Sequence, residues 1–116
     1  MSQQLYAFAF VLFYLVVAHA LFDFPLQGDT VAVNKNRNAK TELQKHVPWY
    51  MWMSSHALCH GGAVALITGS LLFGIAETVA HFIIDFFKCD KRYGIGVDQA
   101  LHILCKITWA LCIWLV

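Results

Sequence analysis

The chain has 116 residues, of which 59% are hydrophobic and 13% are charged, and its formal net charge is +1. This length limits it to one domain, and the composition excludes an ordinary soluble domain in favour of an integral membrane protein. The near-neutral charge gives no indication of an acidic partner, and we expect no nucleic acid among the partners.

Four apolar segments are each long enough to cross the hydrocarbon core of a bilayer as a helix, at about 18 to 20 residues apiece. They lie at residues 5–24, 49–67, 70–87 and 97–116. We therefore predict a single all-α domain over residues 1–116, folded as a four-helix transmembrane bundle. The second and third spans meet at Thr68-Gly69-Ser70, where a tight helical hairpin is favoured over one long broken helix.

The basic residues of the connecting segments predict how these spans are oriented. Lys and Arg lie between the first and second spans and between the third and fourth, whereas the N-terminus, the Thr68 turn and the C-terminus have none. By the positive-inside rule, both basic loops are cytoplasmic and both termini lie on the non-cytoplasmic side of a bacterial inner membrane. Residues 27–47 then form a polar cytoplasmic loop.

A secretory signal ending at Ala18-His19-Ala20 is the alternative for the first segment, but its start lacks Lys and Arg.

Every predicted span carries ionisable residues spaced four apart, which places them on one face of a helix. They are His19 and Asp23, His56 and His60, Glu77, His81 and Asp85, and Asp98 and His102. All nine fall in the cytoplasmic half of their spans. Ionisable groups at membrane depth are costly unless they pair, bind an ion or face a polar interior, so this shared depth indicates a functional site.

Helical bundles build metal sites from carboxylates and histidines that project inward at similar height. Imidazole with carboxylate suits Zn, Fe or Mn. We predict one or two divalent ions, with Asp98 as either a ligand or an orienting group, and the other eight residues as ligands. The alternatives are a hydrogen-bonded polar core that fixes helix register and a proton or ion relay.

Three basic residues are candidates for binding a substrate. Lys35 and Arg37 lie in the 27–47 loop, for which a solvated segment that sets topology is favoured; the functional alternative is that they contact anionic lipid headgroups or a substrate phosphate. Lys106 lies one turn past His102. It either pairs with Glu77, neutralises a substrate phosphate or extends to the interface, and pairing inside the bundle is favoured.

Four motifs surround the polar residues. They are His19-x-x-x-Asp23-Phe24-Pro25-x-Gln27-Gly28-Asp29, His56-x-x-x-His60-Gly61, Glu77-x-x-x-His81-x-x-x-Asp85 and Asp98-Gln99-x-x-His102. With these motifs, nearly the whole chain resembles a family of small bacterial and phage inner-membrane proteins, a domain of unknown function. That family implies no activity. A weaker similarity to membrane-bound metal-dependent hydrolases, based on His pairs followed by Gly, favours hydrolysis over other metal chemistry.

The leading hypothesis is a metal-dependent hydrolase of an ester or phosphoester in a lipid or lipid-linked substrate, with Glu77 or Asp85 as base. The alternatives are a metal or proton conductor and a phage-encoded protein that binds a host membrane complex through a bundle with a structural polar core. A di-iron oxidoreductase is disfavoured because the chain lacks His-His doublets. Expected partners are the lipid bilayer, the lipid-type substrate, and either a second copy of the chain or a host membrane protein.

Overall fold

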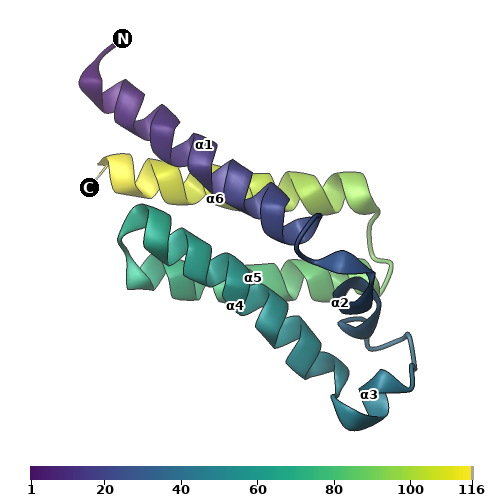
Figure 1. Cartoon of the computed structure of the whole chain (residues 1–116). Helices are drawn as coiled ribbons and strands as arrows, with labels where there is room; N and C mark the ends of the chain where they lie inside the picture. Colours follow the sequence, from purple (N-terminus) through teal and green to yellow (C-terminus); the bar gives the residue numbers. More distant parts are fainter. Residues whose placement is uncertain (116) are drawn as a thin grey trace.

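A computed structural model describes residues 1–115, and this part of the chain is built from six α-helices without any β-strand (Figure 1). The helices are α1 (Gln3–Asp23), α2 (Gly28–Asn34), α3 (Leu43–His46), α4 (Trp49–Thr68), α5 (Leu71–Cys89) and α6 (Ile95–Leu115). The all-α prediction is confirmed. The four long helices coincide with the four predicted apolar segments to within a few residues at each end.

Local chemistry explains where the long helices begin and end. Ser2 and Ser70 precede α1 and α5, and each hydroxyl accepts a hydrogen bond from a first-turn backbone N–H, at 3.1 and 3.2 Å. Helix α1 ends just before Pro25, which has no N–H to donate. Gly69 ends α4 at φ 70°, a left-handed conformation that glycine adopts without steric cost. The chain therefore reverses sharply between α4 and α5.

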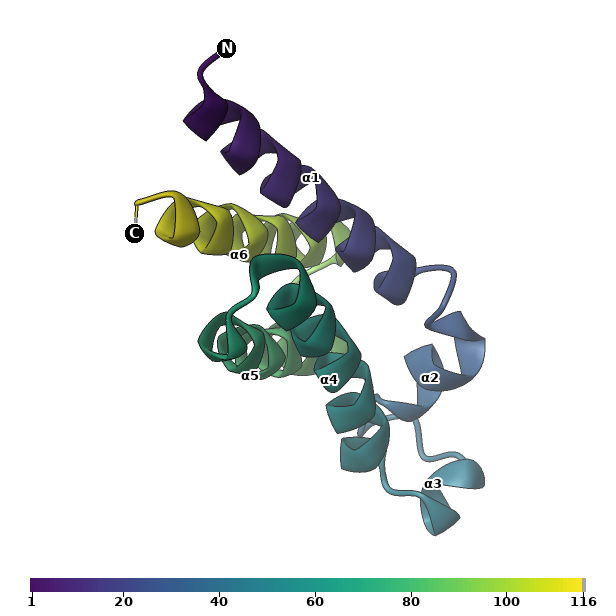
Figure 2. The ribbon, with the colours of Figure 1, turned by 60° about the vertical axis from the view of Figure 1, so that its left-hand side comes forward.

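The four long helices form one bundle, with α2 and α3 at one end (Figures 1 and 2). The N-terminus, the end of α6 and the α4–α5 turn lie at the opposite end from α2, α3 and the α5–α6 connection. The helices α4 and α5 approach each other closely where Gly61 faces Gly74. A β-carbon added to Gly61 would lie 2.5 Å from the Gly74 carbonyl oxygen, so the two backbones are in contact there.

The segment predicted as a solvated polar loop, residues 27–47, is more ordered than expected, because it contains α2 and α3. Asn34 is buried and accepts a hydrogen bond from the Thr41 hydroxyl. The Gln44 side chain donates to the backbone oxygens of Asn34 and Asn36, at 3.0 and 2.8 Å. These contacts between residues several positions apart fold the segment against the end of the bundle and bury Lys35.

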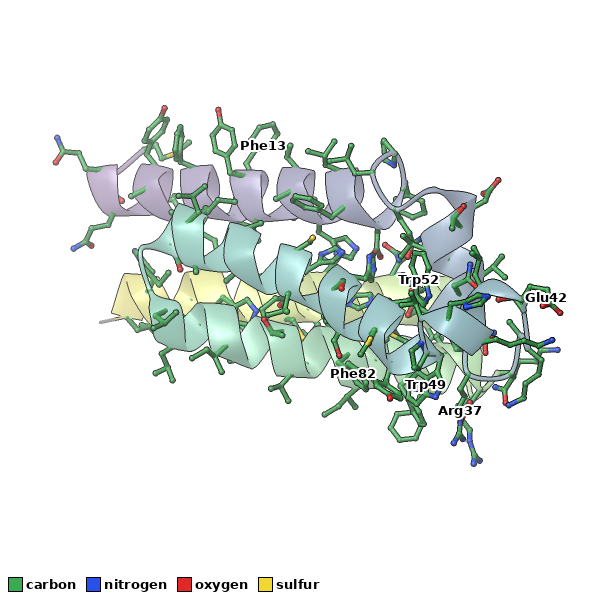
Figure 3. The ribbon with its side chains drawn as sticks, turned by 60° about the horizontal axis from the view of Figure 1, so that its bottom comes forward. Phe13, Arg37, Glu42, Trp49, Trp52 and Phe82 are labelled. Atoms are coloured by element: carbon green, nitrogen blue, oxygen red, sulfur yellow. The ribbon has the colours of Figure 1, made fainter. Side chains whose placement is uncertain are left out.

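Apolar and polar side chains are distributed in the reverse of the soluble pattern. Large apolar side chains such as Phe13, Leu58 and Leu66 are exposed, Leu66 to 86%, and Figure 3 shows Phe13 directed away from the bundle. Most of the buried residues are instead polar or charged. A surface this apolar is typical of a protein that contacts lipid or a partner.

Two of the described helices, α1 and α6, are long and apolar enough to cross a membrane. Helices α4 and α5 have similar lengths but carry more polar residues. Helix α5 contains Glu77, Asp85 and Lys88, and α4 contains His56 and His60 with several aromatic and small residues. The residues that lower the apolar character of α4 and α5 are largely those of the predicted site.

Candidate metal centre

All nine ionisable residues predicted from their spacing are buried, and they converge from α1, α4, α5 and α6 on one region between the helices. Their donor atoms form four overlapping groups, each lying within 4.8 Å. These groups are His19, Asp23, His60 and His81; Asp23, His56, His81 and Asp85; Glu77, His81 and His102; and Asp23, Asp98 and His102. The structure therefore brings the predicted residues together.

The donor atoms of the second group lie at nearly equal separations. Asp23 Oδ1 lies 3.1 Å from His56 Nε2 and 3.4 Å from His81 Nε2, and the two imidazole nitrogens are 3.2 Å apart. Asp85 Oδ2 caps this triangle, at 3.3 Å from His56 Nε2 and 3.4 Å from His81 Nε2. The two carboxylates come from α1 and α5, and the imidazoles from α4 and α5.

These separations are compatible with the ligands of a tetrahedral metal ion. Bonds of about 2.0–2.2 Å from a tetrahedral ion to nitrogen and oxygen ligands place neighbouring ligand atoms about 3.3–3.5 Å apart. Five of the six edges among the four donor atoms measure 3.1–3.4 Å, and the sixth, between Asp23 and Asp85, is at most 4.8 Å. The residues present therefore fit a divalent ion of the zinc type.

His60 adds a further donor beside this group. Its Nε2 atom lies 3.0 Å from Asp23 Oδ1 yet has no hydrogen-bond partner, because the distance is suitable but the direction is not. The His60 ring stacks on that of His81, with centroids 3.6 Å apart. A nitrogen that lies close to a carboxylate oxygen without bonding to it is expected when both atoms are ligands of one ion.

The buried carboxylates of this region outnumber its buried ammonium groups. It contains four carboxylates, those of Asp23, Glu77, Asp85 and Asp98, and the two ammonium groups of Lys35 and Lys106. With neutral imidazoles, two negative charges remain uncompensated. Buried charge is costly unless it is paired, and one divalent cation would balance these two charges.

A family model described as "Protein of unknown function (DUF3307)" matches residues 11–116, and this segment contains all nine of the buried ionisable residues. The chain belongs to the DUF3307 family. Comparisons with curated proteins and with solved structures found no match. The resemblance predicted from the four motifs is thus confirmed, and it carries no activity with it.

In this DUF3307 chain a second set of polar contacts supports the donor group. The Gln99 amide donates to Asp23 Oδ2 at 2.9 Å and to Asp98 Oδ2 at 3.0 Å, and its oxygen lies 2.8 Å from His19 Nε2. His102 Nε2 contacts Asp85 Oδ1 at 2.9 Å. Gln99 was not predicted as a site residue, although its place beside Asp98 in the fourth motif was a signal. These contacts orient the carboxylates in the way that outer contacts orient metal ligands.

Glu77 and Lys106 lie deeper in the bundle than the donor group. Lys106 Nζ donates to Glu77 Oε1, and the indole of Trp109 donates to Glu77 Oε2 at 2.7 Å. The pairing favoured for Lys106 is therefore found, and this lysine is fully buried rather than available to a substrate phosphate. Because both Glu77 oxygens are engaged, Glu77 is better placed to orient His81, whose Nδ1 is 3.5 Å away, than to act as a base.

The structure also separates the two loop residues predicted to bind substrate. Arg37 is exposed, bonds to the Asp90 carboxylate at 2.5 and 3.0 Å and lies over the Phe86 ring. These hydrogen bonds hold the pKa of Asp90 below its usual value. Lys35 instead reaches into the site, where its ammonium donates to Asp85 Oδ2 at 2.6 Å and to Gln27 Oε1 at 2.5 Å. Arg37 thus anchors the loop, and Lys35 contacts the donor group.

The site is closed toward the termini and approached from the loop end. Leu15, Val64 and Ala110 are buried together beyond Lys106 and form an apolar layer with the side chains around them. At the loop end, a cavity of about 320 Å³ reaches His56 between apolar side chains that include Phe22 and Trp52. Molecules that reach the donor group would therefore arrive from the end that carries α2 and α3.

Proposed function

We propose that this chain is a four-helix transmembrane protein of the bacterial inner membrane, in which α1, α4, α5 and α6 all cross the bilayer. The apolar outer surface of the bundle and its polar interior support this proposal. The basic residues of the two connections at the α2–α3 end support a cytoplasmic location for that end, with both termini outside. The ionisable residues of α4 and α5 that belong to the predicted site, and that lower the hydropathy of these helices most, are buried in the bundle.

The observation that carries the functional proposal is the near-tetrahedral group of Asp23, His56, His81 and Asp85 inside a region whose four buried carboxylates outnumber its two buried ammonium groups. We infer that the group binds one divalent ion such as Zn²⁺, Fe²⁺ or Mn²⁺. A second ion, held by His19, His60 or His102 with the remaining carboxylates, is not needed to balance the charge.

The reaction class that this arrangement supports best is metal-dependent hydrolysis of an ester or phosphoester in a lipid or lipid-linked substrate. A bound divalent ion would polarise a substrate oxygen and acidify water. Asp85, the other predicted base, would accept a proton once Lys35 or His102 releases one of its oxygens, and water would then take its place in the donor group. Asp23 would remain a ligand, oriented by Gln99.

A metal or proton conductor is less well supported. A conducting path has to continue past the donor group to the other side of the membrane. Here the Glu77–Lys106 pair and then the apolar layer of Leu15, Val64 and Ala110 fill the bundle between the site and the terminal end. We therefore propose a site with access from one side only.

Metal analysis of detergent-purified protein tests the proposal. We expect about one mole of metal per mole of wild-type protein, and the same in His46→Ala, whose exposed imidazole lies in α3 outside the site. We expect loss of the metal in His81→Ala. Absence of stoichiometric metal from the wild type, or equal metal in both variants, would overturn the proposal.

Folding and activity are measured on the same samples. If His81→Ala does not fold, wild-type protein with added metal still decides the matter, because a bound ion raises the stability by about 2.7 kcal/mol at 100 times its Kd, whereas a structural polar core predicts no change. For hydrolysis of a phosphoester lipid, Asp85→Asn is expected to lower the rate about 10²- to 10⁴-fold. Wild-type protein that binds metal but hydrolyses no ester or phosphoester would refute the reaction class alone.

Labelling of Cys89 tests the topology. This thiol lies at the end of α5 beside the basic connection and is partly exposed. We expect it to react with a membrane-impermeant reagent from the cytoplasmic side of inverted vesicles and not from the outside of intact cells, with Cys89→Ser as the control for labelling of other thiols. Reaction from the outside would reverse the proposed orientation.

A further inference from the structure

Beside the donor group, at the loop end of the bundle, a recess of about 530 Å³ is lined by three lysines, Lys35, Lys88 and Lys91, together with Gln27 and Tyr93. Within residues 1–115, neither Lys88 nor Lys91 forms an ion pair, whereas Arg37 and Lys106 are paired with Asp90 and Glu77. Lys35 is paired with Asp85, so the recess holds two ammonium groups, those of Lys88 and Lys91, that pair with no carboxylate of the described chain.

Lys35 connects this recess to the donor group. Its ammonium lines the recess and also donates to Asp85 Oδ2 and Gln27 Oε1. An ammonium has three N–H donors, so these two bonds leave one for a ligand in the recess. An anion bound there would share Lys35 with Asp85.

We propose that the recess of Lys35, Lys88 and Lys91 is a binding site for a phosphate group, and that Lys35 couples its occupancy to the metal ion held by the donor group. The binding of phosphate stands independently, and the coupling rests on the proposed function. A phosphate ester carries one or two negative charges and several acceptor oxygens, which match two free ammonium groups and the remaining donor of Lys35.

Coupling between the two ligands follows from charge. An anion that accepts a hydrogen bond from Lys35 weakens the hold of this ammonium on Asp85, so Asp85 becomes a better partner for a cation. The anion also offsets the positive charge of Lys35 near that cation. By linkage, each ligand then raises the affinity of the other by the same factor, and couplings of this kind are about 5- to 150-fold.

The neighbouring cavity bears on the source of the phosphate. Gln27 lines both the recess and the apolar cavity of about 320 Å³ that contains Phe22, Leu26 and Trp52. A molecule with a phosphate in the recess could therefore place an alkyl chain across Gln27 in the apolar cavity. This favours a lipid-borne phosphate over free phosphate.

Phosphate binding is tested on protein freed of metal with a chelator. In the first experiment, the binding of inorganic phosphate to the protein in detergent is followed by ³¹P NMR. In the second experiment, the protein is placed in nanodiscs of phosphatidylcholine with and without phosphatidic acid, a lipid that carries a phosphate monoester. The double variant Lys88→Gln/Lys91→Gln is compared with Lys40→Gln/Lys45→Gln, which removes the same charge outside the recess.

We expect the wild type and Lys40→Gln/Lys45→Gln to bind, and Lys88→Gln/Lys91→Gln to bind at least tenfold more weakly. Binding of phosphatidic acid without binding of inorganic phosphate assigns the site to a lipid, and binding of both assigns it to phosphate in general. If neither probe binds, or if the two double variants behave alike, the proposed site is refuted.

Coupling is measured as Mn²⁺ affinity by electron paramagnetic resonance, with and without the phosphate probe. We expect the probe to tighten Mn²⁺ binding about 5- to 150-fold in the wild type and to have no effect in Lys35→Gln. Phosphate binding to a protein that binds no Mn²⁺ would refute the metal proposal and leave the recess intact. Equal tightening in Lys35→Gln would show that Lys35 is not the link.

Discussion

Replacing Gly61 with alanine should push α4 away from α5 and so damage both the fold and the candidate metal centre. The new β-carbon would lie 1.8 Å from the Thr78 hydroxyl oxygen and 2.5 Å from the Gly74 carbonyl oxygen. The Thr78 side chain can rotate, at the cost of its 2.9 Å hydrogen bond to Gly74, but the backbone carbonyl cannot. Relief therefore requires the helices to separate.

The size of the effect follows from these distances. Moving the new β-carbon from 2.5 Å to the 3.4 Å at which ordinary contact begins requires a shift of about 0.9 Å. Overpacking of this kind typically costs about 1–3 kcal/mol. The same shift would change the 3.2 Å separation between His56 and His81, which lie on the two helices. Because metal sites tolerate changes of only about 0.2 Å in ligand distance, we expect weaker metal binding as well.

Gly62 provides a matched control on the same helix, because a β-carbon there meets no atom within 4 Å. Gly62→Ala should leave stability unchanged or raise it, since alanine favours a helix over glycine by up to about 1 kcal/mol. Unfolding in mixed detergent micelles with increasing dodecyl sulfate, followed by circular dichroism, measures the difference. The reasoning is refuted if the two variants unfold at the same dodecyl sulfate fraction.

Three further predictions concern single contacts. Lys106→Met should lower the free energy of unfolding by about 3–5 kcal/mol, because it leaves Glu77 buried without its cation. The double variant Lys106→Met/Glu77→Gln should recover most of this loss in the same micelle assay. Equal losses in the single and double variants would argue against a buried ion pair. Ser70→Ala should cost about 0.5–2 kcal/mol, because it removes the 3.2 Å hydrogen bond to the Phe73 N–H; an unchanged unfolding curve would mean that another group caps α5. In Arg37→Ala the pKa of Asp90 should rise toward 3.8, as measured by carboxyl-carbon NMR. Since the pKa of Asp90 is lowered in the folded protein, the contribution of the Arg37–Asp90 pair to stability is present above pH 3.8. It is lost as the pH falls through the pKa of Asp90 in the folded protein. If the pKa does not move in Arg37→Ala, the shift is due to another neighbour, such as Asn38.

Much of the secondary structure was predictable because its causes are local. The apolar segments matched the four long helices, and Pro25 and Gly69 marked two of their ends for steric reasons that act within a few residues. The two short helices α2 and α3 were not predicted. Their segment looks polar and solvated along the chain, and its order depends on the contacts of Asn34 with Thr41 and Gln44.

The roles of the basic residues show the limit of the sequence. Lys35 and Arg37 are two positions apart and similar in charge, yet one is buried against Asp85 and the other is exposed against Asp90. Their partners lie about 50 residues further along the chain, so no local pattern distinguishes the two. The partner of Lys106 was predictable only as one of several alternatives.

The sequence alone determined that nine ionisable residues lie four apart on helical faces, because a helix turns by a known angle at each residue. It also determined that these faces need a polar environment, since lipid does not solvate charge. Only the tertiary structure decided which donor atoms meet. The distances among Asp23, His56 and His81 depend on how three helices pack, and that packing depends on contacts such as Gly61 against Gly74, between residues far apart in the chain.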